Sequence, residues 1–196
     1  NLDALLKPAL RDELGRILRR AGTTTLVVVH DQEDVVSLAD RVAILRDGGL
    51  WQVGAPREVF AAPRDDYVAR LFGTTNFVRA VVENGMLRTP LGPVATPPAA
   101  LGRDVVTLSI RPYDVLIGQA DEPGVPATVR RVAFRAGFDE VELVTASPEH
   151  GSATVTAHVP PGLTLAPGDV VRIRIRPGAV QVVGLPGPDD PAAPTG

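Results

Sequence analysis

The sequence predicts a short α/β portion followed by an all-β domain. Residues 1–75 contain three prolines and residues 76–196 contain sixteen. The first stretch has the pattern of alternating helices and strands, whereas the second has short strands between Gly/Pro turns, typical of a small barrel or sandwich. We therefore expect an α/β remnant in residues 1–75, an all-β domain in residues 76–186, and a loose tail in residues 187–196.

Each element of the first part has its own signal. Apolar side chains at helical spacing predict an amphipathic helix over residues 8–20, at Leu10, Leu14, Ile17 and Leu18. The β-branched run Thr25–Val29 is typical of a strand buried on both faces of a parallel sheet. The rest is expected to form a helix over 31–39, a hairpin of strands 41–46 and 50–53 around the turn 47–49, and helices near 56–61 and 65–72.

The second part has many short alternating segments. We expect strands at 77–82, 105–111, 125–135, 141–145, 154–159, 170–176 and 180–183. In the 170–176 segment, one face carries Val171, Ile173 and Ile175, and the other carries Arg172, Arg174 and Arg176.

The composition excludes several functional classes. The net charge of −3 argues against a protein that binds nucleic acid by bulk electrostatics, and 44% hydrophobic residues suffice for a core. The absence of cysteine excludes disulfides, cysteine-ligated zinc and thiol catalysis. Three widely separated histidines indicate no metal site. No segment fits a membrane span or a signal peptide, so a cytoplasmic protein is expected.

The single lysine limits what the chain can do with nucleotides. A phosphate-binding loop of the Walker A type needs Gly-Lys followed by Ser or Thr, because the lysine must reach the β- and γ-phosphates. Lys7 follows Leu6 instead. This chain therefore holds no such loop.

His30 is the most informative single position. It follows the expected strand 25–29, and ligands of open α/β sheets bind beyond the carboxyl ends of the strands. An imidazole there could hydrogen-bond a phosphate oxygen or orient a water molecule. Alternatively, His30 merely ends the strand and satisfies a local backbone group. Position alone leaves both interpretations open.

The surrounding residues resemble a known family. Val29 to Asp34, followed by Ala39 to Leu45, closely resembles the switch-histidine region of ATP-binding-cassette (ABC) transporter ATPases. Asn1 to Asp3 resembles the end of that family's D-loop. The segments 47–49, 52–54 and 56–60 are similar to the hairpin and helix that end the same domain, so the resemblance covers residues 1–75.

This resemblance implies roles for two residues. His30 would contact the γ-phosphate and help hold the attacking water, and Asp3 would act at the dimer interface; Asp31 is expected to cap a helix. The Walker A loop, Q-loop, signature motif and Walker B carboxylate, which serve ATP and Mg²⁺, are absent from the sequence. The resemblance thus implies the C-terminal part of a longer ATPase, inactive and without cofactor on its own.

The second part resembles the transport-associated domain, of oligonucleotide-binding-like (OB-like) topology, that importer ATPases append. The similar segments are Asn76-Phe77, Ile110 to Asp114 and Leu165 to Val171, and Thr89 to Gly92 is similar to the ferric-iron branch. The implied whole is a homodimeric ATPase subunit that energises uptake of ferric iron or another small solute. It would work with membrane permease subunits at the inner face of the cell membrane.

Three interpretations apply to the arginine row at Arg172, Arg174 and Arg176. It is the solvated face of a strand, or an oxyanion site with other arginines nearby (Arg111, Arg130, Arg131 and Arg135). Binding of single-stranded nucleic acid is disfavoured, because residues 76–196 carry ten arginines against twelve acids and few aromatic residues for stacking. An alternative function for the whole chain is a non-catalytic regulatory or dimerisation module that binds an oxyanion or a partner protein.

Overall fold

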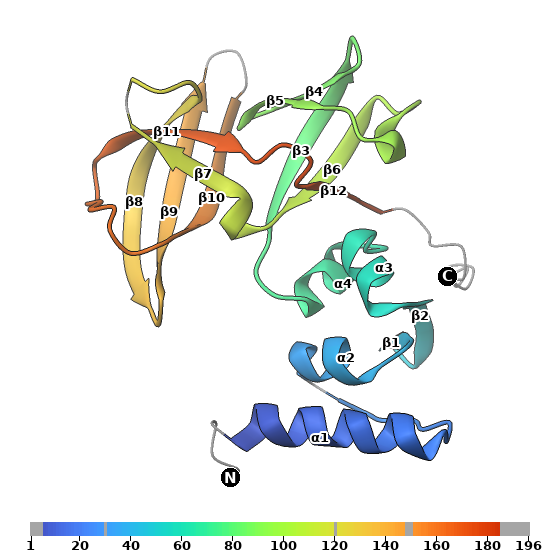
Figure 1. The fold of residues 1–196 in the computed structure, drawn as a ribbon. Coiled ribbons are helices and arrows are strands. Elements are labelled where there is room, and N and C mark those ends of the chain that lie inside the picture. Colours follow the sequence, from blue (N-terminus) through green and yellow to red (C-terminus); the bar gives the residue numbers. More distant parts are fainter. Residues whose placement is uncertain (1–5, 30, 120, 148–150, 185–196) are drawn as a thin grey trace.

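The computed structural model describes residues 6–29, 31–119, 121–147 and 151–184. A helical part with one hairpin comes first and an all-β part follows, so the predicted fold class is confirmed (Figure 1). The first part consists of α1 (Leu6–Ala21), α2 (Gln32–Leu38), β1 (Val42–Arg46), β2 (Gly49–Gly54), α3 (Pro56–Ala61) and α4 (Asp66–Leu71).

Local sequence accounts for these boundaries. Pro8 lies in the first turn of α1, where its missing N–H costs nothing, and Gly22 follows the helix with a φ of 60°. Strands β1 and β2 pair as an antiparallel hairpin in which Arg46 lies opposite Gly49. The two residues between them, Asp47 and Gly48, have φ values of 51° and 78°. Positive φ at both positions matches the right-handed twist of the flanking strands.

The strand predicted at Thr25–Val29 is wrong for this chain. Residues 23–29 belong to no helix or sheet, and Leu26 and Val28 are 93% and 82% exposed. A parallel strand forms only when neighbouring strands supply hydrogen bonds along it, and no described segment lies there to pair with it.

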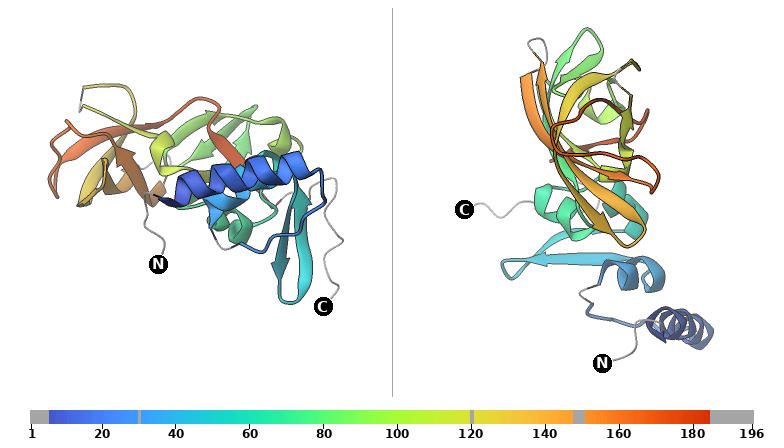
Figure 2. Two further views of the ribbon diagram at one scale, coloured as in Figure 1. Left: turned by 60° about the horizontal axis from the view of Figure 1, so that its bottom comes forward. Right: turned by 90° about the vertical axis from the view of Figure 1, so that its left-hand side faces the viewer.

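The expected helix α1 does form, but its apolar side chains stay exposed. This holds for Leu6, Leu10, Leu14 and Ile17. Helix α1 packs against α2 and lies at the end of the molecule away from the β-domain, as two views agree (Figures 1 and 2). Apolar side chains are therefore left open both on α1 and at residues 26–28, and we call them together the open apolar surface of residues 6–29.

The second part consists of two antiparallel five-stranded sheets. One has the order β12-β6-β3-β4-β5, and the other β10-β9-β8-β11-β7. The strands and two short 3₁₀ turns are β3 (Asn76–Glu83), β4 (Met86–Thr89), β5 (Gly92–Ala95), η1 (Pro98–Ala100), β6 (Val105–Ile110), η2 (Pro112–Asp114), β7 (Val115–Gly118), β8 (Val125–Arg135), β9 (Phe138–Ser147), β10 (Gly151–Val159), β11 (Val170–Ile175) and β12 (Val180–Val183).

The main hydrophobic core fills the space between these sheets. Its fully buried side chains come from both sheets, among them Leu87, Leu108, Leu143 and Ile173. A separate small cluster of Ile44, Val59 and Val68 joins the hairpin to α3 and α4. No helix in the described ranges is long and apolar enough to cross a membrane.

Candidate functional site

Both sequence-predicted site residues, His30 and Asp3, lie outside the described residues. The structure does describe the residues that follow His30, at the beginning of α2. The site can therefore be characterised through the contacts that hold this segment.

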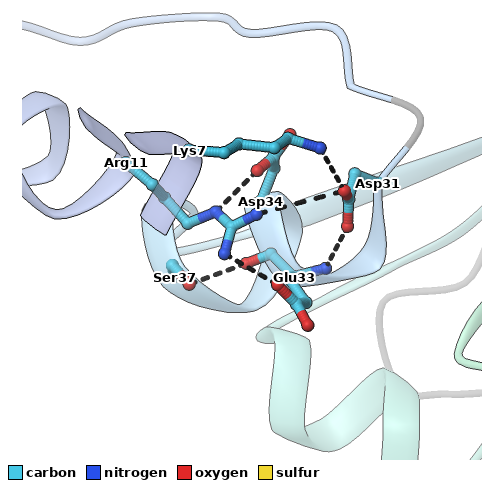
Figure 3. A network of polar contacts seen from close by, with 6 residues as sticks. All are labelled: Lys7, Arg11, Asp31, Glu33, Asp34 and Ser37. Atoms are coloured by element: carbon cyan, nitrogen blue, oxygen red, sulfur yellow. Dashed lines mark hydrogen bonds and ion pairs between the residues drawn. The ribbon is translucent and has the colours of Figure 1, made fainter. Parts of the chain in front are cut away.

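Asp31 caps α2, as the sequence predicts. Its Oδ1 atom accepts a hydrogen bond of 2.9 Å from the backbone N–H of Glu33, which satisfies a free donor of the first helical turn. Its Oδ2 atom accepts a 2.5 Å hydrogen bond from Nζ of Lys7 on α1 (Figure 3). One carboxylate thus begins α2 and ties it to α1.

Arg11 makes the second connection between the two helices. Its Nε atom donates to Asp34 Oδ1 at 2.6 Å, and its Nη1 atom donates to Glu33 Oε2 at 2.9 Å (Figure 3). The Arg11 side chain is only 9% exposed, so this pairing is better shielded than most surface ion pairs. Ser37 closes the network by donating its hydroxyl to the Glu33 carbonyl at 2.7 Å.

The network shifts the titration of its members in matching directions. The hydrogen bond from Lys7, with that from the Glu33 amide, lowers the pKa of Asp31 below its ordinary value. The same contact raises the pKa of Lys7, and the bonds to Asp34 and Glu33 raise the pKa of Arg11. Asp31, Lys7 and Arg11 are therefore charged at neutral pH, and their contacts tie the beginning of α2 to α1.

A shallow hollow adjoins this network. It is lined by Asp31 and Gln32 from the beginning of α2, and by Arg70, Leu71 and Gly73 from the end of α4. Gln32 is exposed. Among the residues that the structure describes, no group of three or more His, Cys, Asp or Glu side chains is arranged to hold a metal ion.

The arginines proposed for an anion site do not gather. Arg130 pairs with Glu142, and Arg131 and Arg135 pair with Glu140, along the β8–β9 hairpin. In the row on β11, Arg172 donates to the Gly124 carbonyl and Arg176 to Asp114 Oδ1. Arg111 lies elsewhere, against α4. The alternation of β11 is confirmed, since Val171 and Ile173 are buried and Arg174 is exposed.

Sequence reasoning missed two residues at the junction of the two parts. Arg111, considered only as an anion ligand, bonds to three carbonyls at the end of α4. Asn76 bonds through its side chain to the backbone of both sheets, at Ile110 and Thr156. The signal for Asn76 was its place at the beginning of the first strand of the β-domain. Nothing in the spacing pointed to the partners of Arg111.

Comparison with known proteins extends these observations. The chain is 34% identical, over 183 residues, to the "Fe(3+) ions import ATP-binding protein FbpC" of Streptomyces avermitilis, covering 93% of this chain and 52% of that protein. It is 35% identical over 144 residues to a "Sulfate/thiosulfate import ATP-binding protein CysA" of Caulobacter vibrioides, covering 74% and 41% respectively. With the "Spermidine/putrescine import ATP-binding protein PotA" of Pseudomonas fluorescens it shares 40% over 145 residues, covering 68% and 38%.

The remaining comparisons add less. No family model matches the chain. A crystal structure of the cytoplasmic molybdate-binding protein ModG with molybdate bound aligns with 55% of this chain and 94% of its own, at 18% identity and a TM-score of 0.44.

The chain spans about half the length of the curated relatives it matches. The similarity runs through both the helical part and the β-domain, since it covers 93% of the chain in the S. avermitilis comparison. The chain is therefore homologous, over most of its 196 residues, to the ATP-binding proteins of ABC importers.

Proposed function

We propose that this chain is the C-terminal portion of the ATP-hydrolysing subunit of an ABC importer. In the full-length homodimer, ATP hydrolysis would energise solute uptake through membrane permease subunits, at the cytoplasmic face of the membrane. The observation that carries this proposal is the 34% identity across both parts of the chain to an importer ATP-binding protein about twice as long.

The open apolar surface of residues 6–29 supports the proposal. Burying one Leu or Val side chain contributes about 1.5–3 kcal/mol, so exposed residues such as Leu26 and Val28 forgo a large stabilisation. A segment of this composition is suited to pair with further strands of an α/β sheet. We propose that the preceding part of the relatives' ATP-binding domain covers this surface in the longer protein.

The described residues do not fit a nucleotide by themselves. Three carboxylates lie at the beginning of α2, those of Asp31, Glu33 and Asp34. They form ion pairs with Lys7 and Arg11. A triphosphate would be repelled by these acids, and Lys7 and Arg11 are already paired with them, so we expect the phosphate cradle and the Mg²⁺ ligands to come from other segments. The proposed roles of His30 at the γ-phosphate and of Asp3 at the dimer interface rest on the family resemblance.

We assign no single solute. The relatives' names include Fe³⁺, sulfate or thiosulfate, and spermidine or putrescine importers. Ferric iron stays the first candidate because three of the matched proteins, from two Streptomyces species and Mesorhizobium japonicum, carry that name.

The test is a chimera in which the N-terminal portion of the S. avermitilis relative precedes residue 1 of this chain. We expect Mg²⁺-dependent ATPase activity in the chimera, and a loss of about 100-fold or more in the H30A variant, as for removal of a positioned acid–base group. The matched control is H150A, which removes another histidine and should leave the activity unchanged.

Two results would contradict the proposal. One is a chimera with protected amides at residues 24–29 but no ATPase activity. The other is an H30A chimera as active as the parent. Failure of residues 24–29 to gain protection would itself contradict the proposed cover of the apolar surface.

The alternative, an oxyanion-binding module, is disfavoured by the contacts of the arginines. Carboxylates already pair with Arg130, Arg131, Arg135 and Arg176. Calorimetry of the full chain with phosphate, sulfate and molybdate should therefore detect no binding. Saturable binding of any of these anions would revive that alternative.

A further inference from the structure

The junction between the helical part and the β-domain is built around one buried arginine. Arg111 follows strand β6 and is only 3% exposed. Its Nη1 atom lies 3.2, 3.2 and 3.1 Å from the backbone carbonyl oxygens of Ala69, Phe72 and Gly73. These are carbonyls at the C-terminal end of α4, which the helix itself leaves without partners.

The surroundings of Arg111 are unusual for a buried cation. Its guanidinium lies over the ring of Phe60 on α3, with 4.6 Å between Cζ and the ring centroid. No ion pair joins it to a carboxylate among the described residues, and the nearby Asp114 pairs with Arg176 instead. Its Nε and Nη2 atoms are buried and have no hydrogen-bond partner in the part of the chain that the structure describes. The cation is therefore held by the end of α4 and one aromatic face.

Two neighbouring residues reinforce the same junction. Residues 72–75 form the linker between α4 and β3. The hydroxyls of Thr75 and Ser109 lie 2.6 Å apart and share a hydrogen bond, buried between this linker and β6. The Asn76 side chain donates to the Thr156 carbonyl at 2.8 Å and accepts from the Thr156 N–H at 2.7 Å. The C-terminal end of the linker is thus held by hydrogen bonds to the β-domain, and Arg111 joins α4 to the same domain.

We propose that Arg111 is a latch that makes α3, α4 and the β-domain move as one body. The helices contribute backbone carbonyls and the Phe60 ring, and the β-domain contributes the guanidinium. By contrast, the main contacts of α1 among the described elements are with α2, and α1 contributes none of the groups around Arg111. In the proposed ATPase, the latch would carry movements of the nucleotide-binding part to the β-domain; that last step alone rests on the proposed function.

The test is hydrogen exchange on the full chain, comparing the parent with R111M, which retains the apolar stem but loses the guanidinium. Removing the donor leaves buried carbonyls unsatisfied, so we expect amides of residues 56–73 to exchange about tenfold faster or more. Amides of β8 and β9, on the other side of the core, should keep their protection. The control is R79M, a change at an exposed arginine on β3, which should alter neither region.

The pattern of protection decides between a latch and a general stabilising role. Unchanged protection at 56–73 in R111M would overturn the proposal. Equal loss in 56–73 and in β8–β9 would also overturn it, because it would show that Arg111 supports the whole core. R111K retains the charge and a donor but not the planar fork, so it should give the same local pattern with a smaller change.

Discussion

Replacing Asp65 by alanine would remove three hydrogen bonds at once. The Asp65 Oδ1 atom caps α4 by accepting from the Val68 N–H at 2.9 Å. Its Oδ2 atom accepts from Arg46 Nη1 and from Trp51 Nε1, both at 2.8 Å. One carboxylate therefore joins the β1–β2 hairpin to the beginning of α4.

The expected cost follows from these three contacts. Loss of a helix N-cap costs about 1 kcal/mol. The Trp51 N–H loses a hydrogen bond to a charged acceptor, worth about 1.5 kcal/mol or more. The Arg46 side chain is 38% exposed, so its ion pair adds no more than about 1 kcal/mol. The free energy of unfolding should therefore fall by roughly 3 kcal/mol, and Tm by about 6–12 °C.

The assay is urea unfolding followed by tryptophan fluorescence, because Trp51 is the only tryptophan in the chain and itself contacts Asp65. D65N should recover about 1 kcal/mol, since its amide oxygen can still cap α4. The control is D66A, which removes an exposed 3.9 Å ion pair and one acidic residue in the first turn of α4, but no cap or buried partner, and should change stability by less than about 1 kcal/mol. Equal stability of the D65A and D66A proteins would contradict the role of Asp65 in joining the hairpin to α4.

Three further predictions concern other parts of the molecule. The hydrogen bond from Lys7 lowers the pKa of Asp31 in the folded protein. The stabilisation from this ion pair is therefore complete above the pKa of Asp31 in the unfolded chain and is lost as the pH falls through its lower pKa in the folded protein. K7M should raise the midpoint of Asp31 in an NMR titration, and an unchanged midpoint would contradict the contact. Burial lowers the pKa of His158, because the charged imidazolium is disfavoured in the folded protein. Protonation of His158 therefore favours unfolding, and the stability falls as the pH drops below the ordinary histidine pKa of about 6.5. By NMR, the imidazole should titrate below that value, and a midpoint above it would contradict the burial of His158. G124A should destabilise the chain by about 2 kcal/mol more than G48A, because the added Cβ would lie 2.7 Å from a carbonyl of β11, whereas Gly48 has open space; equal thermal stability of the two variants would contradict the packing.

Most of the fold could be predicted because local signals determine it. The cap at Asp31, the turn at Asp47 and Gly48, and the alternation in β11 act within a few residues of themselves. Strands β4, β5 and β7, of four residues each, are not among the strands expected from the sequence, although β12 is equally short and is among them. In β5, Pro93 weakens the strand signal.

What the sequence could not predict depends on distant partners. The strand expected at Thr25–Val29 has the right residues, but a strand forms only beside another one. Likewise, the sequence of β8 is the same whether its arginines Arg130, Arg131 and Arg135 bind an anion or pair with acidic side chains on the adjacent strand. Only the β8–β9 register shows that Glu140 and Glu142 lie within reach of them.

The most direct test of the account is hydrogen exchange at residues 24–29, in this chain alone and in the chimera with the N-terminal portion of the relative. The account predicts fast exchange in the chain alone, because this segment has no strand partner there. In the chimera it predicts slow exchange, as for a central strand of a sheet. Equally fast exchange in a folded, ATP-binding chimera would contradict the claim that this segment belongs to the core of the ATPase domain.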